Sequence, residues 1–393
     1  MKLNFIIATI TSAILLMGCL SDKKMGDSLP CIDVTKNYPV KEIILTDIAT
    51  VNYVHLNTKN DDYLYKGFIS YMTENTIVVC DNSSGSILFF SKDGIPKSRF
   101  NRYGVGPEEY PSNMLISVVY DEVADDVFVS STRLVNVIQV YSSIGEYKRK
   151  LTLPHGTRAN PIVDFDKQSL LIFDMQNVFK KFAEVESPFH IIDSSFFLIS
   201  KMDGKELDYI ELQKSEIDLT HVGNTNIGIM FYKRAVKCSD GFLLCNPEKD
   251  TVFLYKNDKS VTPIFCKSPL IKDLDQKIIL GNFIDTERYQ FMVIHTLVAL
   301  EDSDKFPNIY YFRDKHTGEI FRQKISLPEY KDKTFFITAN NYIGNEMLAC
   351  FQLNLFELKE AYKENKLSGK LKEMVASLNE SEDNEVYMFA RFK

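Results

Sequence analysis

The 393-residue chain has a formal net charge of −7, and 45% of its residues are hydrophobic. This apolar content is ordinary for a folded protein, so intrinsic disorder of the whole chain is excluded. The charged residues are mixed along the sequence without a long Lys/Arg block, and we therefore expect no nucleic-acid partner.

The first 18 residues have the pattern of an export signal. Lys2 is followed by an apolar run over residues 5–17 and then by Gly18 and Cys19. The run is shorter than the roughly 20 apolar residues that span a bilayer, which indicates a signal that is removed. Residues 16–19, Leu-Met-Gly-Cys, resemble the lipobox of bacterial lipoproteins, in which the cysteine is lipidated. An ordinary secretory signal that contains a cysteine by chance is the alternative.

These features predict a signal peptide over residues 1–18, lipidation at Cys19, and a tether over residues 19–40. Lipid chains on Cys19 would hold the protein on a membrane. We therefore predict a location in the cell envelope, at the outer membrane, with the periplasmic or surface side left open.

Six cysteines follow Cys19 and are scattered over about 320 residues, an even number in an exported chain. Several lie in strand-like apolar runs, such as Cys80 and Cys245. We expect buried free thiols, with disulfide pairing as the alternative. The sequence has no Cys-x-x-Cys pair, and its histidines lack ligand spacing, so we predict no metal site and no cofactor.

An apolar strand that ends in a tight turn recurs along the chain about every 50 to 60 residues. The copies occupy residues 87–94, 137–145, 196–204, 252–258 and 309–318. Each is rich in β-branched and aromatic residues, and most end in Asp-Gly or a similar pair that tolerates the positive φ of a hairpin turn.

Neighbouring segments complete each unit. A second strand is expected before most copies, at residues 76–81, 126–130, 169–174 and 241–245, and a third after some, at residues 96–100 and 146–153. Four strands at such a period are typical of a propeller blade. Five copies and a sixth unit made from both chain ends predict six blades. Residues 51–56 and 385–392 are the candidates for this closing blade, which would remove a free sheet edge.

One segment departs from the β pattern. Residues 356–367 and 371–378 place apolar residues three and four apart among charged ones, which predicts an amphipathic helix interrupted at Ser368 and Gly369. A helix that packs on the propeller is the favoured interpretation, and a partner-binding helix is the alternative. The predicted domain therefore runs over residues 41–393, with a helical segment at about 356–378.

Several short motifs together resemble a known family. They are residues 32–34, residues 41–48, residues 100–110 with a Gly-x-Gly-Pro-x-Glu-Tyr turn, and Asp383-Asn384 before the last strand. The chain resembles the six-bladed, NHL-like β-propeller lipoproteins of Bacteroides-type bacteria, a domain family of largely unknown function. Departures are His55-Leu-Asn-Thr58, where the family has Pro-Leu-Glu-Thr, and Glu385, where proline is common. The resemblance implies an all-β six-bladed propeller and a lipoprotein, and it carries over no catalytic residues.

Residues 102–110 are the strongest local candidate for a ligand loop, because glycines admit close backbone approach beside charged and aromatic side chains. The candidate ligand residues are Arg102, Tyr103, Glu108, Glu109 and Tyr110. The alternative is a structural turn between blades, in which Gly104 and Gly106 supply unusual φ angles and Tyr110 packs between blades.

No catalytic constellation is recognisable, and no catalytic residue is predicted. The sequence therefore favours a non-catalytic binding or scaffold module for a glycan, a peptide or a partner protein. The alternative is a polysaccharide hydrolase or lyase that uses carboxylates at the propeller axis, which rests on analogy with other propellers. Asp125, Asp126 and Asp164 are among the acidic residues available, and sequence spacing does not select a pair.

Overall fold

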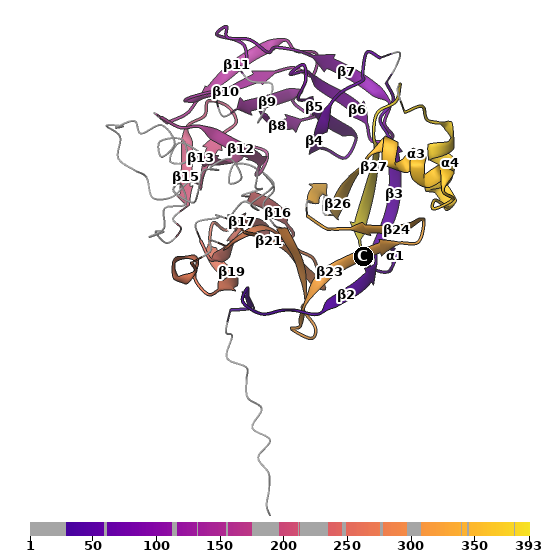
Figure 1. Ribbon diagram of the computed structural model, residues 1–393. Helices are drawn as coiled ribbons and strands as arrows, with labels where there is room; N and C mark the ends of the chain where they lie inside the picture. Colours follow the sequence, from indigo (N-terminus) through magenta and orange to yellow (C-terminus); the bar gives the residue numbers. More distant parts are fainter. Residues whose placement is uncertain are drawn as a thin grey trace, which may run out of the picture.

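Six β-sheets stand around a common axis in the computed structural model (Figure 1). The structure describes residues 29–58, 61–111, 116–131, 133–154, 156–174, 196–210, 212, 235–245, 249–275, 278–296, 308–338, 340–343, 346–380 and 382–393. This architecture confirms the predicted six-bladed β-propeller. The predicted signal peptide and Cys19 lie outside the described residues.

Blades 1 to 3 are each made of four consecutive antiparallel strands. Blade 1 holds β4 (Gly67–Met72), β5 (Thr76–Asp81), β6 (Ile87–Ser91) and β7 (Pro96–Phe100). Blade 2 holds β8 (Ile116–Asp121), β9 (Asp126–Ser131), β10 (Val137–Tyr141) and β11 (Tyr147–Thr152). Blade 3 holds β12 (Ala159–Asp164), β13 (Ser169–Asp174), β14 (Phe196–Ser200) and β15 (Glu206–Ile210).

Blades 4 and 5 follow the same plan and gain extra strands. Blade 4 holds β16 (Ala235–Cys238), β17 (Gly241–Cys245), β18 (Thr251–Lys256) and β19 (Val261–Ser268). A short 3-10 turn, Ile271–Asp273, precedes blade 5. That blade holds β20 (Ile278–Asp285), β21 (Tyr289–Thr296), β22 (Asn308–Asp314) and β23 (Ile320–Leu327), and β24 (Tyr330–Phe335) pairs with β23.

The two ends of the chain meet in blade 6, as the sequence predicts. It holds β25 (Asn340–Ile343), β26 (Glu346–Leu353) and β27 (Val386–Phe392) from the C-terminal part, and β3 (Ala49–His55) from the N-terminal part. β27 pairs with β26 on one side and with β3 on the other, from Val386 opposite His55 to Phe392 opposite Ala49. This pairing closes the ring.

The N-terminal segment also adds outer strands to two other blades. β1 (Cys31–Asp33) runs parallel to β19 of blade 4, and β2 (Val40–Ile44) runs parallel to β23 of blade 5. The short helix α1 (Leu45–Ile48) then leads into β3. Residues 31–55 therefore form a belt along the outside of three blades, and the chain joins the propeller before residue 41.

The expectation of free thiols is wrong for one pair of cysteines. Cys31 of β1 and Cys266 of β19 form a disulfide across 235 residues of sequence, with Cα atoms 4.4 Å apart. The parallel register places the two residues directly opposite each other. Cys80, Cys238 and Cys245 are buried thiols outside any disulfide, as expected, and Cys350 is half-buried and likewise not disulfide-bonded.

The predicted helical segment forms two helices between β26 and β27. They are α3 (Leu355–Lys363), capped by the Asn354 side chain, and α4 (Gly369–Ser377). Their buried face, which includes Leu358 and Leu371, belongs to one apolar cluster with blades 5 and 6. The helices therefore pack on the propeller, as the favoured interpretation predicts (Figure 1). Among the described residues, no helix is long and apolar enough to cross a membrane.

The glycines of the repeated turns have two functions. Gly94, Gly145 and Gly204 have φ between +81° and +85°, which L side chains rarely adopt. Each also packs closely against the end of the outer strand of the preceding blade; a Cβ on Gly145 would lie 2.5 Å from the Phe100 Cβ. The glycine thus permits the turn and lets neighbouring blades approach.

Replacing Gly145 by Ala is expected to lower the free energy of unfolding by about 2 to 4 kcal/mol, because left-handed strain adds to overpacking against Phe100. Gly318→Ala is the matched control, since Gly318 has φ +76° and its Cβ would have only Arg313 Nη2 nearby, at 3.8 Å. The control is expected to cost about 1 kcal/mol in urea unfolding. Equal costs for the two variants would contradict the inter-blade role.

Candidate functional site

The predicted ligand loop, residues 102–110, connects blade 1 to blade 2. Tyr110 is fully buried, and its hydroxyl donates to the Gly85 carbonyl at 2.8 Å while accepting from the Arg102 backbone N–H at 3.0 Å. The Arg102 guanidinium donates to the Gly145 carbonyl of blade 2 at 2.8 Å. These contacts connect the two blades.

The acidic residues of the loop are also engaged in the fold. Glu109 accepts from the Gly106 N–H at 2.8 Å, and the Glu108 carbonyl accepts from the Tyr141 hydroxyl at 2.9 Å. Tyr103 is the aromatic side chain of the loop that stays exposed, at 51%. The contacts favour the alternative of a structural turn, and ligand binding by this loop stays a prediction.

The two loop glycines act differently from the expectation. Neither Gly104 nor Gly106 has a positive φ, so the predicted unusual φ angles are wrong. A Cβ on Gly104 would lie 1.9 Å from Glu109 Oε2. The absence of a side chain at Gly104 therefore makes room for the Glu109 carboxylate.

A polar cluster lies at the axial end of blades 1 to 3. The Lys201 ammonium is 2.7 Å from Asp164 Oδ1 and 3.8 Å from Asp121 Oδ2, and the Tyr71 hydroxyl donates to Asp164 Oδ2 at 3.2 Å. Tyr71 belongs to blade 1 and Asp164 to blade 3, so their contact passes on the axial side of blade 2. Burial raises the pKa of Tyr71 well above its ordinary value, which keeps the donating proton in place.

This cluster places Asp164, one of the acidic residues considered from sequence, at the axis. Asp121 and Asp164 are the last residues of the inner strands β8 and β12. Both face the ammonium of Lys201, whose side chain is only 9% exposed. An acid and base pair for glycoside cleavage needs one protonated carboxyl, whereas these carboxylates share a buried cation. The arrangement is suited to holding blades 1, 2 and 3 together.

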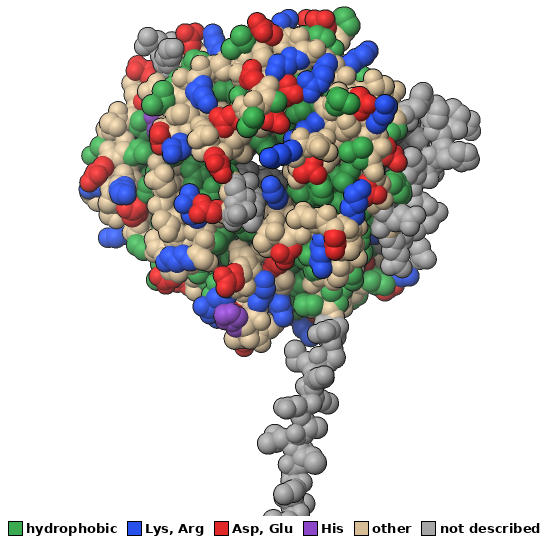
Figure 2. Space-filling model, turned by 180° about the vertical axis from the view of Figure 1, so that it is seen from behind, with side chains coloured by type: hydrophobic (Ala, Val, Ile, Leu, Met, Phe, Trp, Pro, Cys, Tyr) green, Lys and Arg blue, Asp and Glu red, His purple; other side chains and the backbone are tan. Residues whose placement is uncertain are grey.

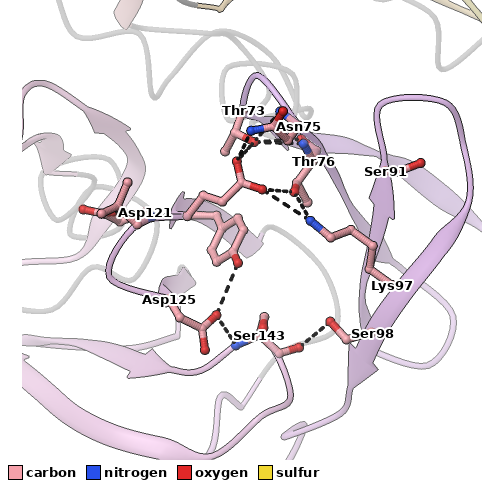
Figure 3. Close-up of polar contacts among 12 residues, drawn as sticks. Thr73, Asn75, Thr76, Ser91, Lys97, Ser98, Asp121, Asp125 and Ser143 are labelled. Carbon is pink, nitrogen blue, oxygen red and sulfur yellow. Dashed lines mark hydrogen bonds and ion pairs between the residues drawn. The ribbon is translucent and has the colours of Figure 1, made fainter.

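Asp125 and Asp126 belong to blade 2 and contact groups of the same blade. Asp125 accepts from the Ser143 N–H at 3.0 Å, and Asp126 is 2.6 Å from the Arg149 guanidinium. Nearby, Glu122 accepts from Thr76 at 2.6 Å and Thr73 at 2.8 Å, and these side chains lie beside Lys97 in Figure 3. Burial acts against the charge of Glu122, but its hydrogen bonds outweigh burial and hold its pKa below the ordinary value.

Asp285 ends the inner strand β20 and differs from the other axial carboxyls. Burial raises the pKa of its carboxyl, and the Lys315 ammonium at 3.1 Å offsets this effect in part. A carboxyl with a raised pKa is a property of general acids. Within the described residues, no group of three or more His, Cys, Asp or Glu side chains is arranged to hold a metal ion.

A groove of about 400 Å³ lies between β24, β26 and α3. Its wall includes Phe335 and Phe351, which contact edge to face at 5.6 Å between ring centroids. The lining side chains are Tyr330, Lys333, Phe335, Thr338, Cys350, Phe351, Gln352, Leu353, Asn354, Glu357 and Leu358. The groove falls within the range of roughly 300 to 1,000 Å³ that is usual for small-molecule sites.

Polar groups at the groove are fixed in place. Lys333 Nζ donates to Glu357 Oε2 at 2.6 Å, and Gln352 donates to the Gly67 carbonyl at 3.1 Å. Asn354 donates to Glu385 at 3.0 Å, so its amide is oriented at the start of α3. An aromatic wall with oriented amides and one ion pair has the chemistry suited to a ligand that is both apolar and hydrogen-bonding.

Sequence reasoning did not identify the groove or Lys201. β24 follows blade 5 as an extra strand, so no repeat position marks it, and α3 comes from outside the β pattern. Lys201 sits in a turn after β14 and resembles any surface lysine in sequence. The face shown in Figure 2 mixes acidic and basic side chains, without a broad area of one sign.

The family of 6-bladed β-propellers matches residues 21–244 of the 393-residue chain. The chain belongs to this family. No curated protein matches it. The match and the six blades together confirm the resemblance found in the sequence as far as the propeller is concerned.

Three solved structures are similar to this chain. A protein of Bacteroides fragilis NCTC 9343 described as exported is 17% identical with a TM-score of 0.59, covering 93% of this chain and 100% of its own. A protein of unknown function from Bacteroides thetaiotaomicron VPI-5482 is 9% identical, covers 87% and 76%, and has a TM-score of 0.38. Virginiamycin B lyase of Staphylococcus aureus is 11% identical, covers 66% and 73%, and has a TM-score of 0.38. The first likeness shows the fold, and the other two are too distant to support an argument.

Lys201→Met is expected to lower the free energy of unfolding by about 3 to 5 kcal/mol, because it leaves the Asp121 and Asp164 carboxylates facing each other without their cation. Lys205→Met is the control, since the Lys205 side chain is 82% exposed in its ion pair with Asp203. This replacement is expected to change the free energy of unfolding by less than about 0.5 kcal/mol. Chemical denaturation measures both. A Lys201 variant as stable as the control would contradict the axial role of the cluster.

Proposed function

We propose that the chain is a lipid-anchored cell-envelope protein whose propeller is a non-catalytic binding module, with its ligand site in the groove between β24, β26 and α3. The observation that carries the proposal is the groove itself, which combines aromatic side chains with oriented amides. The axial carboxylates Asp121 and Asp164, by contrast, are engaged in an ion-pair cluster.

Three observations support the envelope location. Residues 16–19 have the lipobox pattern with Cys19 as its cysteine. The disulfide between Cys31 and Cys266 is a bond that persists in oxidising compartments and is rare in the cytosol. The similar Bacteroides fragilis protein is itself described as exported. Attachment to the outer membrane is part of this proposal.

The chemistry of the groove narrows the ligand class. The Phe351 and Tyr330 rings offer apolar surface, and the Gln352 and Asn354 amides offer hydrogen-bonding groups. Short oligosaccharides and short peptides combine these two requirements. A groove of about 400 Å³ holds only a few units of either.

A second candidate function, polysaccharide cleavage at the axis, is favoured by one observation. Asp285 lies at the end of an inner strand, and burial raises the pKa of its carboxyl as a general acid requires. The second carboxylate that the reaction needs is not identified, because Asp121 and Asp164 face Lys201. The binding proposal therefore has the stronger support.

The test uses isothermal titration of the protein with a panel of di- to hexasaccharides and tripeptides. The double variant Lys333→Ala with Gln352→Ala is expected to weaken binding of the best ligand at least tenfold, because it removes two polar contacts of the groove. Tyr103→Ala is the matched control at the exposed aromatic of the inter-blade loop and is expected to bind normally.

Two results would contradict the proposal. Normal binding by the groove variant with loss of binding in Tyr103→Ala would move the site to the loop of residues 102–110. Cleavage of an oligosaccharide that is abolished by Asp285→Asn would establish the axial enzyme instead.

A further inference from the structure

We infer that the rim formed by β1, β2 and the outer strands β19 and β23 faces a phospholipid bilayer, so that the propeller stands on its edge. We call the surface of these four strands the belt rim. The inference rests on the proposed lipid anchor at Cys19 and adds to it the orientation of the body on the membrane.

The first step is the place where the tether begins. Cys31 is fixed to blade 4 by the disulfide to Cys266 and by strand pairing at three successive residues. The Pro30 carbonyl also accepts from the Cys266 N–H at 2.8 Å. The described contacts between the N-terminal segment and the body therefore begin at Pro30.

The second step is length. Twelve residue steps separate Cys19 from Cys31. They reach about 40 Å when fully extended, and about 20 Å as a root-mean-square distance for a flexible coil. A domain of this size is about 50 Å across. A tether shorter than the body keeps its attachment point nearer to the membrane than the opposite rim.

The third step is the surface around the attachment point. β1, β2, β19 and β23 share one edge of the ring, and β7 and β11 lie at the opposite edge (Figure 1). Val40 of β2 is 61% exposed and Leu270, just after β19, is 45% exposed. The Lys36 side chain, in the turn between β1 and β2, is 67% exposed. Exposed apolar side chains and a lysine suit the interface between lipid headgroups and water. Ile95 and Ile144 at the opposite edge are exposed to 63% and 62%, so it is the short tether that selects the belt rim.

This orientation determines where the propeller axis and the groove lie relative to the membrane. With the belt rim toward the bilayer, both open ends of the propeller axis face sideways into water. The groove at α3 is lined by β24, which pairs with β23 of the belt rim. In this orientation the groove therefore lies close to the membrane surface.

The test uses the chain on phosphatidylcholine and phosphatidylglycerol vesicles that contain a lipid with an amine-reactive headgroup. Lys324 on the belt rim is compared with Lys97 on β7, because the two side chains are similarly exposed, at 49% and 43%. Each is in an ion pair, with Glu42 at 3.2 Å and with Glu122 at 3.3 Å. Mass spectrometry measures their modification, normalised to that by a water-soluble reagent. Lys324 is expected to be modified at least fivefold more than Lys97.

A variant with nine Gly/Ser residues inserted before Pro30 lengthens the tether from 12 to 21 residue steps and leaves the attachment of β1 to β19 intact. The preference for Lys324 is then expected to fall below twofold, since 21 steps reach about 70 Å. Equal modification in the intact protein, or a preference for Lys97, would overturn the inference.

A control separates the anchor from the orientation. Flotation of the natively produced chain with vesicles reports whether Cys19 is acylated. A soluble chain that begins at Cys19, with Cys350→Ser, is in addition coupled through Cys19 to a maleimide lipid. If the natively produced chain does not float but the coupled protein still prefers Lys324, only the proposed anchor at Cys19 is contradicted. If the natively produced chain floats but the coupled protein shows no preference for Lys324, only the orientation is contradicted.

Discussion

The pairing of β3 with β27 is the contact on which the rest of the structure depends. β27 would otherwise be an exposed outer edge of blade 6, and an open edge invites pairing with other chains. Seven residues of β3 lie opposite seven residues of β27, so the N-terminal strand completes the last sheet. Because blade 6 contacts both blade 5 and blade 1, this one pairing places both chain ends and fixes the ring.

Closure leaves a seam between neighbouring blades, and the seams of blades 1 to 3 combine an apolar cluster with polar contacts. A ring of six sheets has six seams between neighbouring blades. Contacts across each seam must keep the two blades together. The Lys201 cluster and the Glu122 network serve the seams of blades 1 to 3. Of the acidic residues considered for catalysis, Asp164 takes part in these contacts, whereas Asp125 and Asp126 make contacts within blade 2. Chemistry that involves a ligand is therefore better sought at the edge of the ring, where α3 and β24 add surface that the repeat does not use.

Much of the fold is readable from sequence because a blade is a local unit. The copy at residues 87–94 predicts β6 and its turn, and residues 76–81 and 96–100 predict β5 and β7 with the observed bounds. Alternation and turn chemistry suffice for these strands. The disulfide was missed because Cys31 and Cys266 meet only through a parallel pairing of strands 235 residues apart. The groove was not predicted because β24 and α3 lie outside the repeated strand pattern, so no repeat position marks the surface between them.

Residue-resolved hydrogen exchange in β27 tests the central claim of ring closure most directly. If β3 pairs with β27 as described, β27 is an interior strand, and all its amides from Tyr387 to Arg391 exchange as slowly as those of β5. If the ring were open at this point, β27 would be an edge strand. Every second amide of β27 would then exchange rapidly, and that alternation would contradict the account.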